Sequence, residues 1–297
     1  MRGAGALVLT TAALFLTSCE RATGPPPPER ARRVVPASAT ACDLVGALLP
    51  VENVVAVPAQ AEEHSTWGRQ VALDAELPRF PSYLAEPILR VAPDLVVVDA
   101  YQSEDTSRRL AEAGISLHRL PVIDDLDGAW RALTELGVAL GRSDEAARLI
   151  EGQRQRREAL AAAAATRRSW RVLAYSNFSG QGWTAGGGTT LDSMLTLAGL
   201  TNAGAEGGKT GHRRLTHEEL LAIDPELLLI GAGPVEGAVS PTLTLLRDVA
   251  LLEELSALRD ERVVVLPSHY FSTASHEILG GAELLAAEVA AREPSLR

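Results

Sequence analysis

Two stretches of the chain share one pattern of apolar and polar positions. Residues 85–98 read AEPILRVAPDLVVV, and residues 217–230 read HEELLAIDPELLLI. Each stretch has an acidic residue, apolar residues at helical spacing, a proline, a second acid and four apolar residues. Proline cannot continue the helix before it, and four unbroken apolar residues suit a parallel strand that is buried on both faces. The pattern therefore predicts a helix, a stop and a buried strand in each stretch.

The repetition of this pattern predicts two similar lobes. Glu86 and Glu218 each stand seven positions before a proline, and they lie 132 residues apart. That separation is longer than the period of a repeat array. Short apolar runs alternate with helical segments from Val34 to Leu120 and again from Arg171 onward, which is typical of a mostly parallel sheet. One stretch alone would mean little, because helix–proline–strand joins are common in α/β proteins.

The remaining segments complete the predicted architecture. An amphipathic helix over 126–140 and a helix over 143–166 fill the middle of the chain. The second helix would be roughly 35 Å long, enough to cross one lobe. Segments 58–67 and 175–188 are expected to be loops, and a helix over 41–49 follows the first strand. Three polar residues near the start of that helix are candidate caps: Ser38, Thr40 and Asp43.

The predicted fold is thus α/β, with two Rossmann-like lobes of mostly parallel sheet that are joined by a single long α-helix. The N-terminal lobe is expected over residues 34–123 and the C-terminal lobe over 169–297. Linking helices are expected over 124–168.

The start of the chain predicts export and a lipid anchor. Residues 1–18 hold an arginine and then a short apolar run, which indicates a signal peptide. Cys19 follows Leu-Thr-Ser, the pattern at which a bacterial lipoprotein is cut and lipidated. Residues 19–33 are rich in proline and arginine and would form a tether. With Cys19 lipidated, Cys42 has no cysteine partner and is expected to be a buried helix residue. The protein is then exported, periplasmic or at the cell surface, and held at a membrane.

Charge narrows the choice of partners. The whole chain has a net charge of −10, and residues 1–33 hold five arginines and two glutamates, which leaves −13 for the folded body. Such a body repels nucleic acid. An anionic ligand would need basic groups close to it.

Aromatic residues gather where predicted strands end. Parallel sheets bind ligands beyond the carboxyl ends of their strands, and seven of the chain's twelve aromatic residues fall in those positions. Their convergence would suit one large ligand in a cleft between two lobes; alternatively, each aromatic side chain covers its own lobe. The seven are Trp67, Tyr101, Tyr175, Phe178, Trp183, Tyr270 and Phe271.

Histidines and an arginine in the same class of segment add polar candidates. His64, His212 and His269 could ligate a metal or haem iron, but no pair has the spacing of neighbours on a helix, and isolated histidines are more often hydrogen-bonded residues. Arg213 could pair with a carboxylate of the ligand. Patterns for a catalytic triad, a zinc protease or a P-loop are absent from the sequence. No cofactor is expected, although the ligand itself could contain iron or cobalt.

With these residues assembled, the chain resembles the substrate-binding proteins of ABC importers that take up cobalamin, ferric siderophores or haem. The resemblance covers roughly residues 33–290, but it does not extend to residues 62–77. The motifs that carry it are RVVPASAT at 33–40, AEPILRVAPDLVVV, LGVALGRSDEAARL at 136–149, WTAGGGTTLDSMLTLAGLTNAG at 183–204, HEELLAIDPELLLI, and RVVVLPSHYFSTAS at 262–275.

The resemblance implies a monomeric binding protein without catalysis. Its partners would be a metal chelate, an ABC permease with its ATPase, and a membrane through the lipid anchor. Glu86 and Glu218 match the glutamates that dock each lobe of such proteins onto the permease. Two other hypotheses stay open from the residues alone: a lipid-anchored, metal-dependent enzyme on the same scaffold, and a ligand-sensing module without a transporter.

Overall fold

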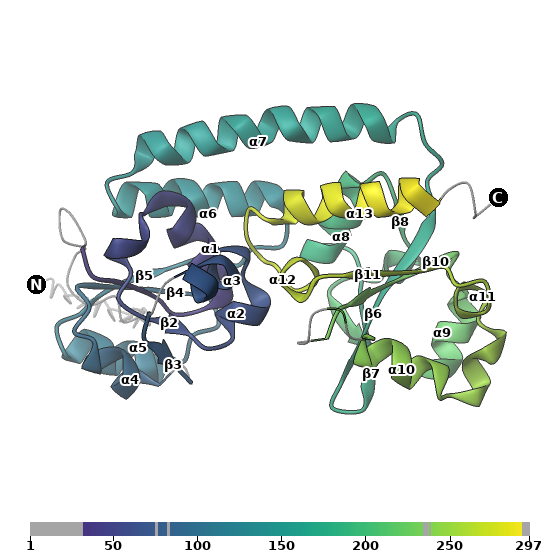
Figure 1. Ribbon diagram of the computed structural model, residues 1–297, viewed down its shortest axis with the longest axis horizontal. Helices are drawn as coiled ribbons and strands as arrows, with labels where there is room; N and C mark the ends of the chain where they lie inside the picture. Colours follow the sequence, from purple (N-terminus) through teal and green to yellow (C-terminus); the bar gives the residue numbers. More distant parts are fainter. Residues whose placement is uncertain (1–31, 75–76, 82–83, 234–236, 238, 293–297) are drawn as a thin grey trace, which may run out of the picture.

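The computed structural model describes residues 32–74, 77–81, 84–233, 237 and 239–292, and the account of structure below concerns these residues. The predicted signal peptide and Cys19 lie outside them. Figure 1 shows two α/β lobes side by side under one long helix. We call the elements from β1 to β5 the N-lobe and those from β6 to α13 the C-lobe. The predicted two-lobe α/β fold is confirmed.

The N-lobe is built on a parallel sheet with strand order β1-β4-β5. A second parallel pair, β2 and β3, lies beside it, and a bridge between Val34 and Val54 connects the two parts. The strands are β1 (Val34–Pro36), β2 (Val57–Pro58), β3 (Arg79–Phe80), β4 (Leu95–Val98) and β5 (Ser116–Arg119). The helices are α1 (Ala39–Leu48), α2 (Ala61–His64), α3 (Thr66–Asp74), α4 (Ala85–Arg90) and α5 (Glu104–Glu112).

The C-lobe sheet has the order β11-β10-β6-β7-β9, and β8 also pairs with β6. Strands β8, β6, β10 and β11 run parallel, whereas β7 and β9 form an antiparallel edge. The strands are β6 (Arg171–Phe178), β7 (Gln181–Ala185), β8 (Thr201–Asn202), β9 (His212–Arg214), β10 (Leu227–Gly231) and β11 (Val263–Leu266). The helices are α8 (Thr190–Leu197), α9 (His217–Ile223), α10 (Pro241–Arg247), α11 (Ser256–Arg259), α12 (Ser268–Phe271) and α13 (Ile278–Arg292). Short 3-10 turns lie at Ala203–Ala205 and Ala250–Glu254 in this lobe and at Val51–Asn53 in the N-lobe.

The two repeated stretches fold alike down to single hydrogen bonds. Each forms a helix, then a residue with positive φ before the proline (Ala92 at 44°, Asp224 at 38°), then a buried strand. The acid after the proline accepts a backbone N–H at the start of the first strand of its lobe: Arg33, just before β1, donates to Asp94 at 3.1 Å. In the C-lobe, Arg171 donates to Glu226 at 2.9 Å. The predicted sequence of helix, stop and strand is confirmed in both lobes.

Two antiparallel helices bind the lobes into one body. Helix α6 (Leu126–Ala139) packs under α7 (Ser143–Ala164), and α7 runs along the top of the molecule (Figure 1). One hydrophobic cluster passes from α1 through α6 to α13 and includes the fully buried Leu44, Leu133 and Leu285. Because this cluster is shared, the lobes cannot separate without exposing core side chains.

Several predicted details were wrong. The expected loop over 58–67 contains α2 and the start of α3, and the expected loop over 175–188 contains most of a β-hairpin, with Ser179 and Gly180 at positive φ in its two-residue turn. Ser38 caps α1, but Asp43 lies inside that helix.

Cys42 is fully buried, as expected. None of the helices in the described part of the chain is long and apolar enough to cross a membrane.

Candidate ligand-binding cleft

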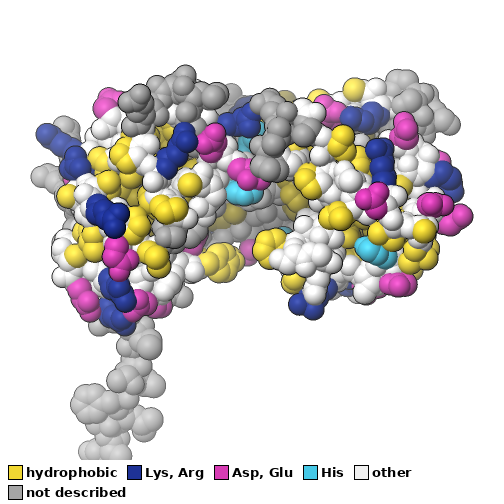
Figure 2. Space-filling view, turned by 60° about the horizontal axis from the view of Figure 1, so that its bottom comes forward, with side chains coloured by type: hydrophobic (Ala, Val, Ile, Leu, Met, Phe, Trp, Pro, Cys, Tyr) yellow, Lys and Arg dark blue, Asp and Glu magenta, His cyan; other side chains and the backbone are white. Residues whose placement is uncertain are grey.

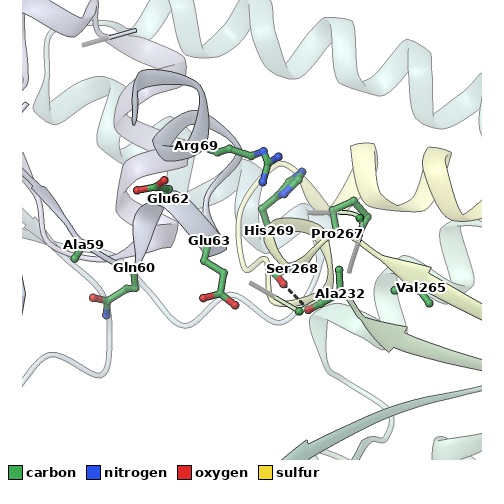
Figure 3. Close-up of a pocket in the computed structure, with 12 residues that line it drawn as sticks. Ala59, Gln60, Glu62, Glu63, Arg69, Ala232, Val265, Pro267, Ser268 and His269 are labelled. Carbon is green, nitrogen blue, oxygen red and sulfur yellow. Dashed lines mark hydrogen bonds between the residues drawn. The ribbon is translucent and has the colours of Figure 1, made fainter. Parts of the chain in front are cut away.

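A cleft of about 710 Å³ lies between the two lobes. Its volume is within the range of small-molecule and cofactor sites. Figure 2 shows histidine and acidic side chains gathered where the lobes meet, and Figure 3 shows the lining residues. The N-lobe contributes Ala59, Gln60, Glu62, Glu63 and Arg69, and the C-lobe contributes Ala232, Gly233, Gly237, Val265, Pro267, Ser268 and His269.

The ends of parallel strands form the C-lobe wall. Ala232 directly follows β10, and its N–H donates to the carbonyl of Leu266 at the end of β11 at 2.7 Å. Ser268 begins α12, and its hydroxyl donates to the carbonyl of Ala232 at 2.8 Å. The cleft is therefore at the carboxyl edge of the sheet, where open α/β proteins bind ligands.

Short helices form the N-lobe wall. Strand β2 ends at Pro58, and the next residue, Ala59, donates its N–H to the carbonyl of Phe80 at 3.0 Å. The chain then turns into α2 and α3, which present Glu62, Glu63 and Arg69 to the cleft. The wall is thus made largely by the segment to which the family resemblance does not extend.

The described lining carries charges of both signs. Arg79 lies 3.1 Å from Glu62, and Nε2 of His64 lies 3.9 Å from Glu63. Across the cleft, the rings of His269 and Tyr270 are tilted against each other with centroids 4.5 Å apart. Paired carboxylates and an imidazole offer hydrogen-bond acceptors and donors without a large field of one sign.

Of the aromatic and basic residues expected to bind the ligand, His269 lines the described cleft. Trp67 lies behind the N-lobe wall, because a Cβ on Gly46 of α1 would come within 2.1 Å of Cγ in its ring. Tyr175 is fully buried in the C-lobe core, which gives it a packing role in this structure. Tyr270 is half-buried in α12, beside the lining residue His269.

The other predicted ligand residues lie on the surface or on the antiparallel edge of the C-lobe. Tyr101 is 81% exposed after β4, and Phe178 is 72% exposed at the end of β6, next to the hairpin turn. Arg214 lies over the ring of Trp183, with its guanidinium carbon 5.8 Å from the ring centroid. Arg213 is half-buried, with Nη1 3.9 Å from Glu219.

The histidines predicted as metal candidates do not form one metal site in the described part of the chain. His212 is exposed on β9, whereas Nδ1 of His64 lies 3.1 Å from the hydroxyl of Ser272, so His64 contacts the C-lobe. Within the ranges the structure describes, no group of three or more histidine, cysteine or acidic side chains could hold a metal ion.

The two expected docking glutamates lie in the first turns of corresponding helices. Glu86 is the second residue of α4 and Glu218 the second residue of α9; both are exposed, and the two helices lie on the sides of the lobes away from α7 (Figure 1). Oε1 of Glu86 accepts from Arg109 at 2.9 Å. Hydrogen bonding to its own backbone N–H and to Thr216 lowers the pKa of Glu218, so it stays ionised.

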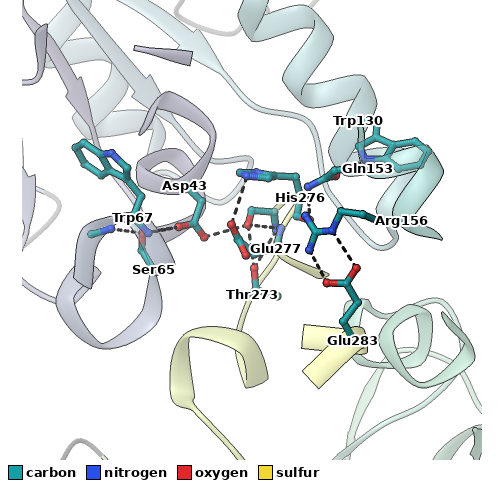
Figure 4. A network of polar contacts seen from close by, with 12 residues as sticks. Asp43, Ser65, Trp67, Trp130, Gln153, Arg156, Thr273, His276, Glu277 and Glu283 are labelled. Carbon is teal, nitrogen blue, oxygen red and sulfur yellow. Dashed lines mark hydrogen bonds and ion pairs between the residues drawn. The ribbon is translucent and has the colours of Figure 1, made fainter. Parts of the chain in front are cut away.

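A buried polar network between the lobes was missed in the sequence (Figure 4). Its centre is Asp43, which accepts hydrogen bonds from Ser65, from the Trp67 backbone and from Ser275. Ser275 stands 232 positions after Asp43, and no local pattern reports a contact of that separation.

Two α/β lobes on a shared helical support, with a cleft at the strand ends, define a two-lobe solute-binding protein. Residues 43–270 match the periplasmic binding protein family, and the chain belongs to that family. It is therefore a binding protein of the periplasmic type, and the family consists of exported, periplasmic proteins.

Known proteins agree with this assignment. A cobalamin-binding protein of Halobacterium salinarum is 28% identical over 147 residues, which are 49% of this chain and 40% of that protein. The periplasmic heme-binding protein RhuT from Roseiflexus sp. RS-1, in apo form, has a TM-score of 0.75 at 23% identity and covers 90% of this chain and 100% of its own. A periplasmic heme-binding protein from Pseudomonas aeruginosa has a TM-score of 0.74 at 25% identity, with coverage of 87% and 92%.

Proposed function

We propose that the protein captures a metal chelate in the interlobe cleft and delivers it to an ABC permease and its ATPase. The observation that carries the proposal is the cleft of about 710 Å³ at the carboxyl edge of the C-lobe sheet. Support comes from similar proteins that are described as binding cobalamin or heme. The tether of residues 19–33, lipidated at Cys19, would keep the binding protein near its permease.

Among the chelates of this class, the lining favours cobalamin. The N-lobe wall holds the carboxylates of Glu62 and Glu63, and Arg79 lies 3.1 Å from Glu62. A haem with two carboxylates, or a polyanionic ferric siderophore, would place further carboxylates beside these two, and Arg69 is the one arginine among the described lining residues that could offset them. The amide groups of cobalamin can instead donate hydrogen bonds to Gln60 and to the two glutamates.

Delivery would use the two exposed glutamates. Glu86 and Glu218 lie at equivalent positions of the two lobes, so basic residues of a two-fold permease could meet both. Exposed ion pairs contribute little binding energy each, which suits a reversible contact that orients the partner. Glu86 already pairs with Arg109 at 2.9 Å and must exchange that partner on docking, whereas Glu218 is exposed in the first turn of α9.

The test of delivery is a double substitution, Glu86→Ala with Glu218→Ala. Ligand affinity is expected to stay unchanged while uptake into cells is abolished. The matched control is Glu112→Ala with Glu253→Ala. Both glutamates are exposed, so this double substitution removes the same charge and should leave uptake intact. Loss of ligand binding in the folded double variant, or normal uptake, would overturn the proposed roles.

A further inference from the structure

One buried carboxylate connects the two walls of the cleft. The side chain of Asp43 is almost fully buried, at 2% exposure. Its Oδ1 accepts from the Ser65 hydroxyl at 2.6 Å and from the Trp67 backbone N–H at 3.1 Å, both at the start of α3 in the N-lobe wall. Its Oδ2 accepts from the hydroxyl of Ser275 at 3.0 Å, in the segment that follows the C-lobe wall (Figure 4).

A second polar contact lies close to the first. Nδ1 of His64 is 3.1 Å from the hydroxyl of Ser272, and that hydroxyl donates to the carbonyl of Ser268 in the C-lobe wall at 2.7 Å. Ser65 also caps α3 by accepting the N–H of Gly68 at 2.8 Å. The positions of α3 and of the segment after α12 are therefore set by the same small group of side chains.

The contact with Ser275 can persist whether Asp43 is ionised or protonated. Ser275 is fully buried, and its hydroxyl also lies 3.0 Å from the Thr273 hydroxyl and accepts from the N–H of Glu277 at 3.2 Å. An ionised Asp43 accepts the Ser275 proton. A protonated Asp43 can donate to Ser275, which then donates to Thr273, so rotation of the hydroxyls satisfies both states.

The neighbouring acid, Glu277, comes from the other lobe, and its backbone N–H donates to the Ser275 hydroxyl that contacts Asp43. Burial raises the pKa of Asp43 to about 6. Burial and then the Asp43 charge raise the pKa of Glu277, between Ser275 and α13, to about 7. The cation on α7, Arg156, is held in a bidentate pair by Glu283 of α13.

Three other ionisable neighbours, His276, Cys42 and Tyr270, keep one charge state near neutrality. Burial lowers the pKa of His276 to about 4, although its Nε2 lies 3.5 Å from Glu277. Burial raises the pKa of the Cys42 thiol on α1 and of the Tyr270 phenol on α12, so both stay uncharged. Asp43 and Glu277, one from each lobe, are thus the two acids of this network whose pKa values are raised into the range between pH 5 and 8.

We propose that Asp43 is a positioning residue for both walls of the cleft, and that with Glu277 it forms a proton-dependent lock between the lobes. Below about pH 6 the two carboxyls carry at most one charge and the lobes are held together. At higher pH both ionise, like charges face each other across the lobe contact, and the contact loosens. The proposal concerns the lobe contact itself and holds whichever ligand the cleft takes.

The sign of the pH effect follows from the two raised pKa values. Each acid has a folded-state pKa above its ordinary value of 3.8 or 4.5, so its contribution to stability is complete below that ordinary value. The contribution is lost as pH rises through about 6 for Asp43 and about 7 for Glu277.

The test compares urea unfolding of the wild type and Asp43→Asn between pH 8 and pH 5. In this variant the amide oxygen can still accept from Ser65 and Trp67, and the amide nitrogen can donate to Ser275. Relative to the variant, the unfolding constant of the wild type should fall about tenfold from pH 8 to pH 5. The control Glu253→Gln, an exposed acid of the C-lobe, should run parallel to the wild type.

A double-mutant cycle with Glu277→Gln separates a proton-dependent lock from simple packing. The coupling free energy between Asp43 and Glu277 should be repulsive at pH 8 and vanish at pH 5. Backbone hydrogen exchange over residues 272–277, corrected for intrinsic rates, should slow at the lower pH in the wild type alone. Parallel pH profiles of variant and wild type, or equal coupling at both pH values, would refute the proposal. If Asp43→Asn does not fold, the pH profile of Glu277→Gln decides by the same criterion.

Discussion

Two glycine substitutions in helices should change stability in opposite directions. An alanine in the interior of a helix is about 1 kcal/mol more favourable than a glycine. Gly152 lies on the exposed face of α7 with no atom within 4 Å of a built Cβ. Gly152→Ala should therefore stabilise the protein by about 0.5–1 kcal/mol.

Gly46→Ala meets the ring of Trp67. The added Cβ would lie 2.1 Å from Cγ and 2.3 Å from Cδ1 and Cδ2, so the ring must move by more than an ångström to reach ordinary contact at about 3.5–4.0 Å. Such overpacking costs about 1–3 kcal/mol. After the helix-propensity gain of about 1 kcal/mol, the net expected loss is roughly 0–2 kcal/mol.

Urea unfolding of both variants, followed by tryptophan fluorescence, measures this difference. Because both variants gain the same helix propensity, the expected gap between Gly46→Ala and Gly152→Ala is the overpacking cost of about 1–3 kcal/mol. If both variants are stabilised equally, the Trp67 ring does not pack on α1. It would then be free to turn into the cleft, and the reasoning that places it behind the wall would be refuted.

Two further predictions separate buried side chains from exposed ones. Tyr175→Ala should lower the free energy of unfolding by about 3–5 kcal/mol because Tyr175 is fully buried. Phe178→Ala should change it by no more than about 0.5 kcal/mol because Phe178 is 72% exposed. Equal losses for the two variants in urea unfolding would contradict this placement. Gln153→Ala should cost about 1–3 kcal/mol because the Trp130 indole N–H, which donates to Gln153 at 2.6 Å, loses its buried acceptor. The exposed neighbour Gln155→Ala is the control, and equal effects of the two glutamine substitutions in the same assay would argue against the buried hydrogen bond.

Local signals made most of the lobe architecture predictable. Pro93 and Pro225 stop their helices and precede four buried apolar residues, and those signals need no distant partner. The hairpin between β6 and β7 was missed because its strands include glycine and polar residues. The pair Ser179 and Gly180 was the available sign of a two-residue turn.

The cleft was less predictable because long-range contacts decide its lining. Strand β6 continues to Phe178, so Tyr175 stays within the sheet instead of entering an exit loop. The helices α2 and α3 depend on Asp43, which holds Ser65 and the Trp67 backbone from a different helix. Sequence patterns placed His269 at the end of β11, and it does line the cleft, because that position follows from a local strand signal.

Titration of the purified protein with cyanocobalamin, haem and a panel of ferric siderophores tests the central claim most directly. Visible spectra and tryptophan fluorescence would be compared for the wild type, for Val265→Trp, which fills the cleft, and for Val138→Trp on the exposed face of α6. We predict saturable binding of cyanocobalamin at submicromolar concentration by the wild type and by Val138→Trp, and its loss in Val265→Trp. If no chelate binds below about 10 micromolar, where roughly 7 kcal/mol is already available, or if Val265→Trp binds like the wild type, the assignment of a chelate to this cleft is contradicted.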